Sequence, residues 1–64
     1  MTVDVICYGE RTTWSSRDEA MNFYLTGMIM TDGSERERYA DIYSELRMGK
    51  KVCTDGSRER MRKP

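Results

Sequence analysis

The segment SERERYADIYSELRMG, residues 34–49, carries the clearest helical pattern in the chain. Its large apolar side chains repeat at the spacing of one helix face: Tyr39, Ile42, Tyr43 and Leu46. Charged residues of both signs occupy the other positions, and Ser34 can form a capping box with Glu37. Gly49 follows the last apolar positions, where a left-handed helix end is common. The segment therefore predicts an amphipathic helix.

A second helix is predicted directly before this one. Ser16 and Glu19 form another capping-box pattern. An apolar stripe follows at helical spacing: Ala20, Met21, Tyr24, Leu25 and Met28. Gly27 either permits the close approach of another backbone or marks an early end of the helix. Because Asp32 and Gly33 leave only a short connection, the two helices should pack antiparallel as a helical hairpin.

Short strands are predicted on both sides of the helices. The residues TVDVICY, 2–8, alternate as a half-buried strand does, and residues 12–14 form either a returning strand or a loop. Residues 50–53 predict a short closing strand. The fold class is therefore α+β: an N-terminal strand or hairpin, an antiparallel two-helix hairpin and a closing strand. In the predicted core, Tyr24, Leu25 and Met28 pack against the other helix, over Val3, Val5 and Cys7.

The length of 64 residues allows one small domain, which we place at residues 1–53, followed by a basic, flexible tail at 54–64. The whole chain has no net charge, but from Arg47 to Pro64 seven basic side chains face only two acidic ones. The motif Thr-Asp-Gly-Ser at 31–34 recurs at 54–57. In the tail, however, only Met61 is available to hold a third helix on the core.

The composition argues against catalysis and against a metal or other cofactor. The chain has no histidine, and its two cysteines, Cys7 and Cys53, stand too far apart for a Cys-x-x-Cys site. We interpret both cysteines as small buried hydrophobic residues in a reducing compartment. No long apolar run and no signal peptide are visible, so we expect a cytoplasmic protein without a membrane segment.

Protein binding is the function class that the sequence favours. Four apolar residues are candidates for a partner-binding surface: Trp14, Met28, Ile29 and Met30. The alternative is that Met28 and Ile29 complete the core of the domain and that Met30 packs under the following loop. Because small domains gain stability by association, we also expect a homo-oligomer.

Nucleic-acid binding is the rival interpretation. It would use the basic side chains of the tail, Arg58, Arg60, Arg62 and Lys63, together with exposed aromatic rings. The sequence pI of about 6.2 argues against a dedicated nucleic-acid-binding domain, which normally has a strongly basic face.

The segments YGERTTW (8–14), SRDEAM (16–21) and GSERERY (33–39), together with Ile42 and Tyr43, resemble small uncharacterised proteins and domains of mobile genetic elements. These are carried by phages, plasmids and conjugative elements of gut bacteria. The resemblance implies a non-enzymatic interaction protein, of the anti-CRISPR kind, that inhibits a host defence protein such as a CRISPR nuclease. The alternative is a small oligomeric nucleic-acid-binding accessory protein.

Overall fold

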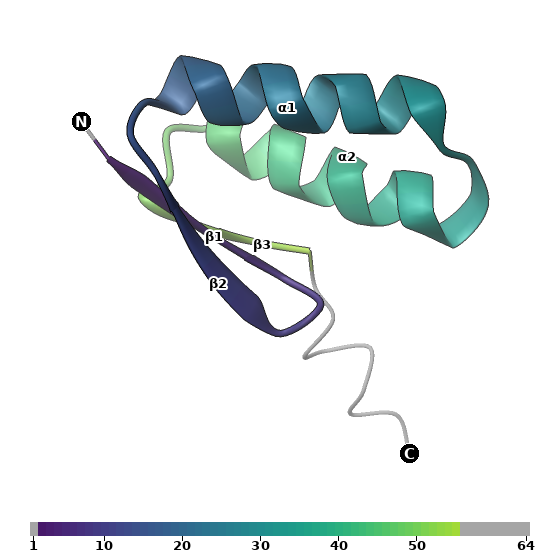
Figure 1. The fold of residues 1–64 in the computed structure, drawn as a ribbon, viewed down its shortest axis with the longest axis horizontal. Helices are drawn as coiled ribbons and strands as arrows, with labels where there is room; N and C mark the ends of the chain where they lie inside the picture. The colour runs from purple at the N-terminus through teal and green to yellow at the C-terminus, as the bar shows by residue number, and fades with distance from the viewer. Residues whose placement is uncertain (1, 56–64) are drawn as a thin grey trace.

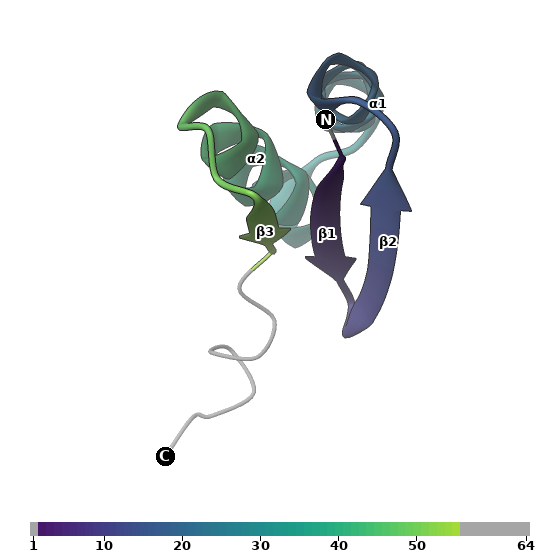
Figure 2. The same cartoon turned by 90° about the vertical axis from the view of Figure 1, so that its left-hand side faces the viewer.

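The structure, a computed structural model, describes residues 2–55 and has the predicted α+β architecture (Figure 1). The elements follow in the order β1 (Val3–Cys7), β2 (Glu10–Trp14), α1 (Arg17–Met30), α2 (Gly33–Arg47) and β3 (Val52–Thr54). The strands form one sheet in the order β2-β1-β3. Both helices pack on one side of this sheet and leave its other side without a helix (Figure 2). The predicted strand at the N-terminus is therefore a hairpin.

The hairpin between β1 and β2 turns on two residues with positive φ. Tyr8 has φ 55° and Gly9 has φ 81°, and Cys7 lies opposite Glu10 in the antiparallel register. A two-residue turn of this kind matches the right-handed twist of the strands. Glycine adopts a positive φ at little cost, whereas tyrosine does so only when its surroundings hold it there.

Strand β3 returns beside β1 in parallel, because the helical hairpin carries the chain back to the start of the sheet. Val5 pairs with Cys53 in this register. Two further backbone hydrogen bonds bracket the pairing: Asp4 N–H donates to Lys51 O at 2.9 Å, and Asp55 N–H donates to Ile6 O at 3.1 Å. The sheet pairing therefore continues to Asp55, two residues beyond the domain boundary expected at Cys53.

Helix α1 begins as the sequence predicts. The N–H of Glu19 donates to Ser16 Oγ at 3.1 Å. The Glu19 carboxylate accepts from the hydroxyl of Ser15 at 2.6 Å, which replaces the expected return bond to the backbone of Ser16. At the other end, Thr31 Oγ1 donates to the carbonyl of Gly27 at 2.8 Å and satisfies one of the free carbonyls of the last turn.

Helix α2 begins earlier than the capping box at Ser34 predicts, so that prediction is wrong. Its first residue is Gly33, with φ 65°, and the side chain of its N-cap residue Asp32 makes no capping hydrogen bond. The positive φ of Gly33 lets the chain reverse within a very short connection. The C-terminus is as expected: Gly49 has φ 89°, and the N–H groups of Gly49 and Lys50 donate to the carbonyls of Leu46 and Glu45.

Among residues 2–55, seven apolar side chains are buried and form the core: Val3, Val5, Ala20, Tyr24, Ile42, Leu46 and Cys53. The predicted packing of Tyr24 against α2 is confirmed, and its ring centroid lies 5.8 Å from that of Tyr39. The prediction is wrong for Leu25, which is 38% exposed. The helices meet along the side of α1 that carries Ala20 and Tyr24, so the neighbouring Leu25 turns outward.

Gly27 is close to a side chain of α2 and not to a backbone segment as predicted, and α1 continues past it to Met30, so it does not end the helix early. A Cβ atom at this position would lie 2.9 Å from the ring of Tyr39. At the other end of the helix pair, the guanidinium of Arg17 donates to three carbonyls at the end of α2: Leu46 at 3.0 Å, Lys50 at 2.9 Å and Gly49 at 3.3 Å. A cation that satisfies free carbonyls at a helix C-terminus is favourable. These two contacts hold α1 against α2.

Ile42→Ala and Leu46→Ala should each destabilise the domain by about 2–5 kcal/mol, because each substitution leaves a cavity in place of a fully buried side chain. A domain of this size is stable by only about 3–10 kcal/mol, so each variant should be largely unfolded near body temperature. Thermal melting by circular dichroism measures the effect, with the exposed Val52→Ala as the control. A melting curve unchanged by both core substitutions would refute the packing described.

Candidate interaction surface

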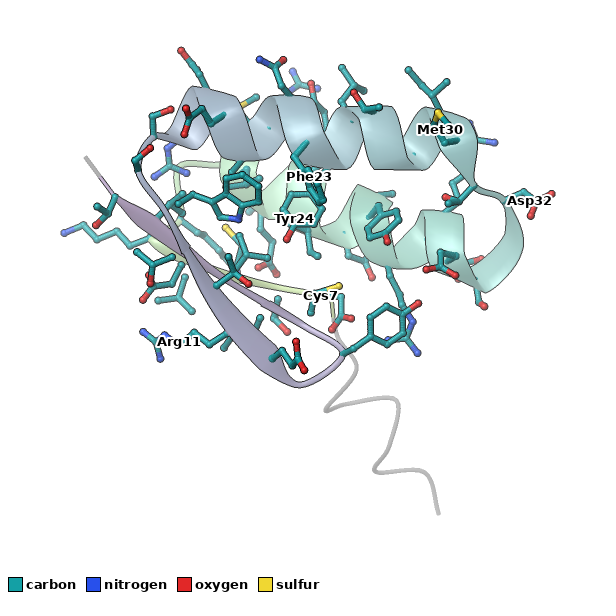
Figure 3. The ribbon with its side chains drawn as sticks, viewed as in Figure 1. Cys7, Arg11, Phe23, Tyr24, Met30 and Asp32 are labelled. Atoms are coloured by element: carbon teal, nitrogen blue, oxygen red, sulfur yellow. The ribbon has the colours of Figure 1, made fainter. Side chains whose placement is uncertain are left out.

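Helix α1 carries an uncharged surface that faces solvent. No charged residue occurs from Ala20 to Thr31. The outer face of α1, as we call it, comprises the exposed residues of this stretch: Asn22, Phe23, Leu25, Thr26, Ile29 and Met30. Phe23 is 55% exposed, Ile29 76% and Met30 77%. Figure 3 shows Met30 near the end of α1 that adjoins the turn at Asp32.

The structure divides the four candidate partner-binding residues. Ile29 and Met30 project into solvent, so the alternative that Ile29 completes the core and Met30 packs under the loop is wrong for these two residues. Met28 and Trp14 are half-buried. The Trp14 ring lies against the core, with its centroid 6.0 Å from that of Tyr24.

Sequence reasoning missed Phe23 as a surface residue. Its ring lies 5.1 Å from that of Trp14 and 5.0 Å from that of Tyr24, yet more than half of its surface is exposed. The available signal was that Phe23 falls outside the apolar stripe of α1. Trp14 thus packs against Phe23 at one edge of the outer face of α1.

Elsewhere on residues 2–55, the large exposed apolar side chains are Tyr8, Met48 and Val52, which lie apart on the hairpin turn, the end of α2 and β3. On the side of the sheet without a helix, Asp4 accepts hydrogen bonds from the side chains of Arg11 and Thr13, which lower the pKa of the Asp4 carboxyl. The exposed side of α2 carries charges of both signs: Arg36, Glu37, Asp41 and Arg47. The outer face of α1 differs from these positions because its exposed apolar side chains gather on one helix with no charged residue among them.

A polar network joins the hairpin turn, α2 and the end of β3. Asp55 is fully buried, and its Oδ2 accepts from the backbone N–H of Tyr8 at 2.9 Å and from Arg38 Nη1 at 3.1 Å. The Arg38 guanidinium lies 4.4 Å from the centroid of the Tyr8 ring. The Tyr8 hydroxyl donates to Glu35 Oε2 at 2.9 Å. These contacts explain how Tyr8 is held at a positive φ.

The network corrects the boundary between domain and tail. Thr54 belongs to β3 and Asp55 is buried, whereas both were assigned to the flexible tail. The Thr-Asp-Gly-Ser repeat favoured a turn at this point, because the sequence does not show that Arg38 lies opposite Asp55. The rest of the expected tail, with Arg58, Arg60, Arg62 and Lys63, lies outside the described residues, so the nucleic-acid interface stays a prediction.

The two cysteines are free thiols in protected surroundings. Cys53 is fully buried, as expected, and Cys7 is half-buried beside the network. Burial raises the pKa of the Cys7 thiol to about 11, and the nearby Asp55 carboxylate adds to this increase. Burial also raises the pKa of Cys53. Because the thiolate is the nucleophilic form, both groups are poor nucleophiles at neutral pH.

Within residues 2–55, no group of three or more His, Cys, Asp or Glu side chains is placed to hold a metal ion. No helix in this part of the chain is long and apolar enough to cross a bilayer. Comparison with known proteins adds no relative: no protein family, curated protein or solved structure matches the chain.

Cys7 should react with iodoacetamide far more slowly than an unfolded cysteine, and its rate should rise with pH toward a midpoint of about 11. Because the pKa of the Cys7 thiol is higher in the folded than in the unfolded state, the free energy of unfolding should decrease as the pH rises from about 9 toward 11. Mass spectrometry of alkylated peptides gives the rate, with the chain in urea as the control. A midpoint near 9 in the folded chain would contradict the assigned environment.

Asp55→Asn should destabilise the domain by about 3 kcal/mol, because it removes the charge that compensates the largely buried Arg38. The exposed Glu37→Gln on the same helix is the matched control and should change the melting temperature little. Chemical denaturation measures both free energies of unfolding. Equal stability of the two variants would show that the Asp55–Arg38 pair is dispensable.

Proposed function

We propose that this chain is a non-enzymatic protein-binding module that docks its partner on the outer face of α1. The supporting observation is the uncharged stretch from Ala20 to Thr31, whose exposed side chains include Phe23, Ile29 and Met30. A surface helix normally presents charged residues to water, as α2 does. Contiguous exposed apolar residues typically mark an interaction site.

The energetics of the exposed residues favour a docked partner. Full burial of an Ile or Met side chain contributes about 1.5–3 kcal/mol relative to full exposure. Ile29 and Met30 are each more than three-quarters exposed, so most of this contribution is still available to an interface. Phe23 adds an aromatic ring that is already ordered by its contacts with Trp14 and Tyr24. A pre-ordered side chain loses less conformational entropy on binding.

The chemistry of the described residues supports a non-enzymatic role. The protected thiols of Cys7 and Cys53 are poor nucleophiles. A shallow hollow of about 330 Å³ lies at the end of α2, lined by Tyr43, Ser44, Arg47 and Met48. The chain has no histidine that could act as a general base toward the Ser44 hydroxyl in this lining.

The resemblance of residues 8–14, 16–21 and 33–39 to small proteins of mobile elements indicates the kind of partner. We propose a host defence protein such as a CRISPR nuclease, which the chain would inhibit by occupying it. This identification rests on the resemblance, whereas the location of the docking surface rests on the exposed residues of α1.

The double variant Ile29→Glu/Met30→Glu should lose partner binding by more than about tenfold, because docking would then bury two carboxylates. The matched control is Met48→Glu, which changes a side chain that is 69% exposed at the end of α2. The measurement is affinity capture from a nuclease-treated lysate of gut bacteria, with quantitative mass spectrometry. Both variants should melt like the wild-type chain, since all three positions are exposed.

Equal capture of the same proteins by the two variants would overturn the proposed docking surface. A chain that lacks residues 56–64 tests the rival interpretation, which is nucleic-acid binding by the basic C-terminal residues. This chain keeps Asp55 and the described residues. If binding is lost in this chain and kept in the α1 variant, the C-terminal residues carry the function instead of α1.

A further inference from the structure

We propose that strand β2 pairs, along its outer edge, with an extended segment of the partner protein in which an apolar residue stands between two basic ones. This inference rests on the proposed function, because the segment belongs to the same partner that docks on the outer face of α1. An added strand binds through backbone hydrogen bonds, and its alternate side chains give specificity. Figure 2 shows β2 at the edge of the sheet, on the same flank of the molecule as α1.

The backbone groups of Arg11 and Thr13 point away from the sheet. The two-residue turn makes Cys7 and Glu10 a hydrogen-bonded pair, and bonded pairs alternate with non-bonded pairs along an antiparallel ladder. Arg11 and Thr13 occupy the non-bonded positions, so their N–H and C=O groups face outward. We call these groups the free edge of β2.

The bonds of β1 agree with this assignment. Asp4 lies opposite Thr13, and Ile6 lies opposite Arg11. The N–H of Asp4 donates toward the β3 side at 2.9 Å, and the carbonyl of Ile6 accepts from that side at 3.1 Å. Because these groups of Asp4 and Ile6 bond toward β3, they are not directed at β2.

The opposite edge of the sheet is already occupied. The outward N–H of Thr54 in β3 donates to Glu45 Oε1 at 2.9 Å, and Lys50 Nζ lies 3.5 Å from the other oxygen of the same carboxylate. Within residues 2–55, no side chain or loop bonds the outward N–H groups of β2 in this way. Four of the five residues of β2 are exposed. Of the two edges, β2 is therefore the one that can accept a further strand.

The side chains beside the free edge are apolar in the middle and acidic at the ends. Glu10 and Trp14 lie on the helix side of the sheet, at the two ends of β2. The ring of Phe23 is 55% exposed and lies 5.1 Å from that of Trp14, and Figure 3 shows Phe23 on the side of α1 toward β2. At the Trp14 end, the exposed Glu19 accepts from the hydroxyl of Ser15, the residue after the strand, at 2.6 Å.

This arrangement selects the sequence of the added strand. Every second residue of that strand faces the helices. In antiparallel pairing, a basic residue lies opposite Glu10, and an apolar residue lies opposite Thr12 beside the ring of Phe23. A second basic residue lies opposite Trp14, within reach of Glu19. Opposite charges on neighbouring strands stabilise the pairing. The segment thus has the pattern basic-x-apolar-x-basic.

Neither a second copy nor the end of this chain fits the pattern. Paired with itself about Thr12, β2 of a second copy places its Glu10 beside Glu19, and like charges oppose this contact. In residues 56–64, Glu59 stands two positions before Met61, where the pattern requires a basic residue.

The first test uses the unmodified chain and a capped synthetic peptide, Lys-Thr-Val-Thr-Lys. In an NMR titration the amide signals of Arg11 and Thr13 should shift, with a Kd of about 1 mM, and their hydrogen exchange should slow several-fold. The matched control is the same peptide with both threonines N-methylated, which keeps the side chains but loses the donors that face β2. It should bind at least about tenfold more weakly. A peptide with glutamate in place of both lysines should also bind more weakly, because Glu10 and Glu19 repel it.

The second test removes one outward donor from the chain. Thr13→Pro deletes the N–H of the free edge, at a position where edge strands tolerate proline. Thr13→Ala is the matched control, since both variants lose the hydroxyl that donates to Asp4 and only the proline variant loses the N–H. Thr13→Pro should bind the peptide at least about tenfold more weakly than Thr13→Ala, at a similar melting temperature.

The inference is overturned if the N-methylated peptide binds as well as its parent, or if Arg11 and Thr13 show no shift up to about 5 mM peptide. A dimer in sedimentation, with both amides protected without peptide, would assign the edge to a second copy instead. If the peptide does not bind but capture of another protein still depends on Ile29 and Met30, the proposed function stands and the added strand is rejected. If the peptide binds but capture is equal for Ile29→Glu/Met30→Glu and Met48→Glu, the strand site stands and docking on α1 is rejected.

Discussion

The buried carboxylate of Asp55 is the constraint on which the rest of the fold depends. A carboxylate with no exposed surface is tolerated only where donors surround it, because removing an unpaired charge from water costs several kcal/mol. Here the donors come from the turn residue Tyr8 and from Arg38 of α2. One side chain therefore connects the hairpin, the second helix and the end of β3. It also holds β3 beside β1 in parallel register.

The position of α1 follows from contacts at its two ends. Arg17 binds the last carbonyls of α2, and Gly27 admits the ring of Tyr39. Between these points Ala20 and Tyr24 enter the core. Their side of the helix must face inward, so the opposite side faces water whatever residues it carries. The exposed apolar face is thus a direct result of how the helix is anchored.

This arrangement separates the residues that stabilise the fold from those of the proposed docking surface. The core uses Ile42, Leu46 and the strand residues, whereas Ile29 and Met30 add little to it. Residues with no part in the core can be chosen for a partner without loss of the fold. The half-buried Trp14 lies between the two roles, because it packs on the core and orders the ring of Phe23.

Local patterns were enough to predict both helices and the first and closing strands in their order, whereas β2 was left open between a strand and a loop. The spacing of Tyr39, Ile42, Tyr43 and Leu46, the cap at Ser16 and the helix end at Gly49 depend on residues within a few positions of one another. The same reasoning named Met28, Ile29 and Met30 as more apolar than one side of a helix can bury, but it left open whether they complete the core or face a partner.

Contacts between distant residues could not be found in this way. The burial of Asp55 requires Arg38, and the outward turn of Leu25 and Phe23 depends on which side of α1 meets α2. The local sequence around a carboxylate in a turn motif, or around an apolar residue in a helix, does not show whether a residue far along the chain packs against it. The sequence alone determined the two helices, the first and closing strands and a surplus of apolar residues. Only the tertiary structure decided which of those residues remain exposed, because burial depends on the packing of the whole chain.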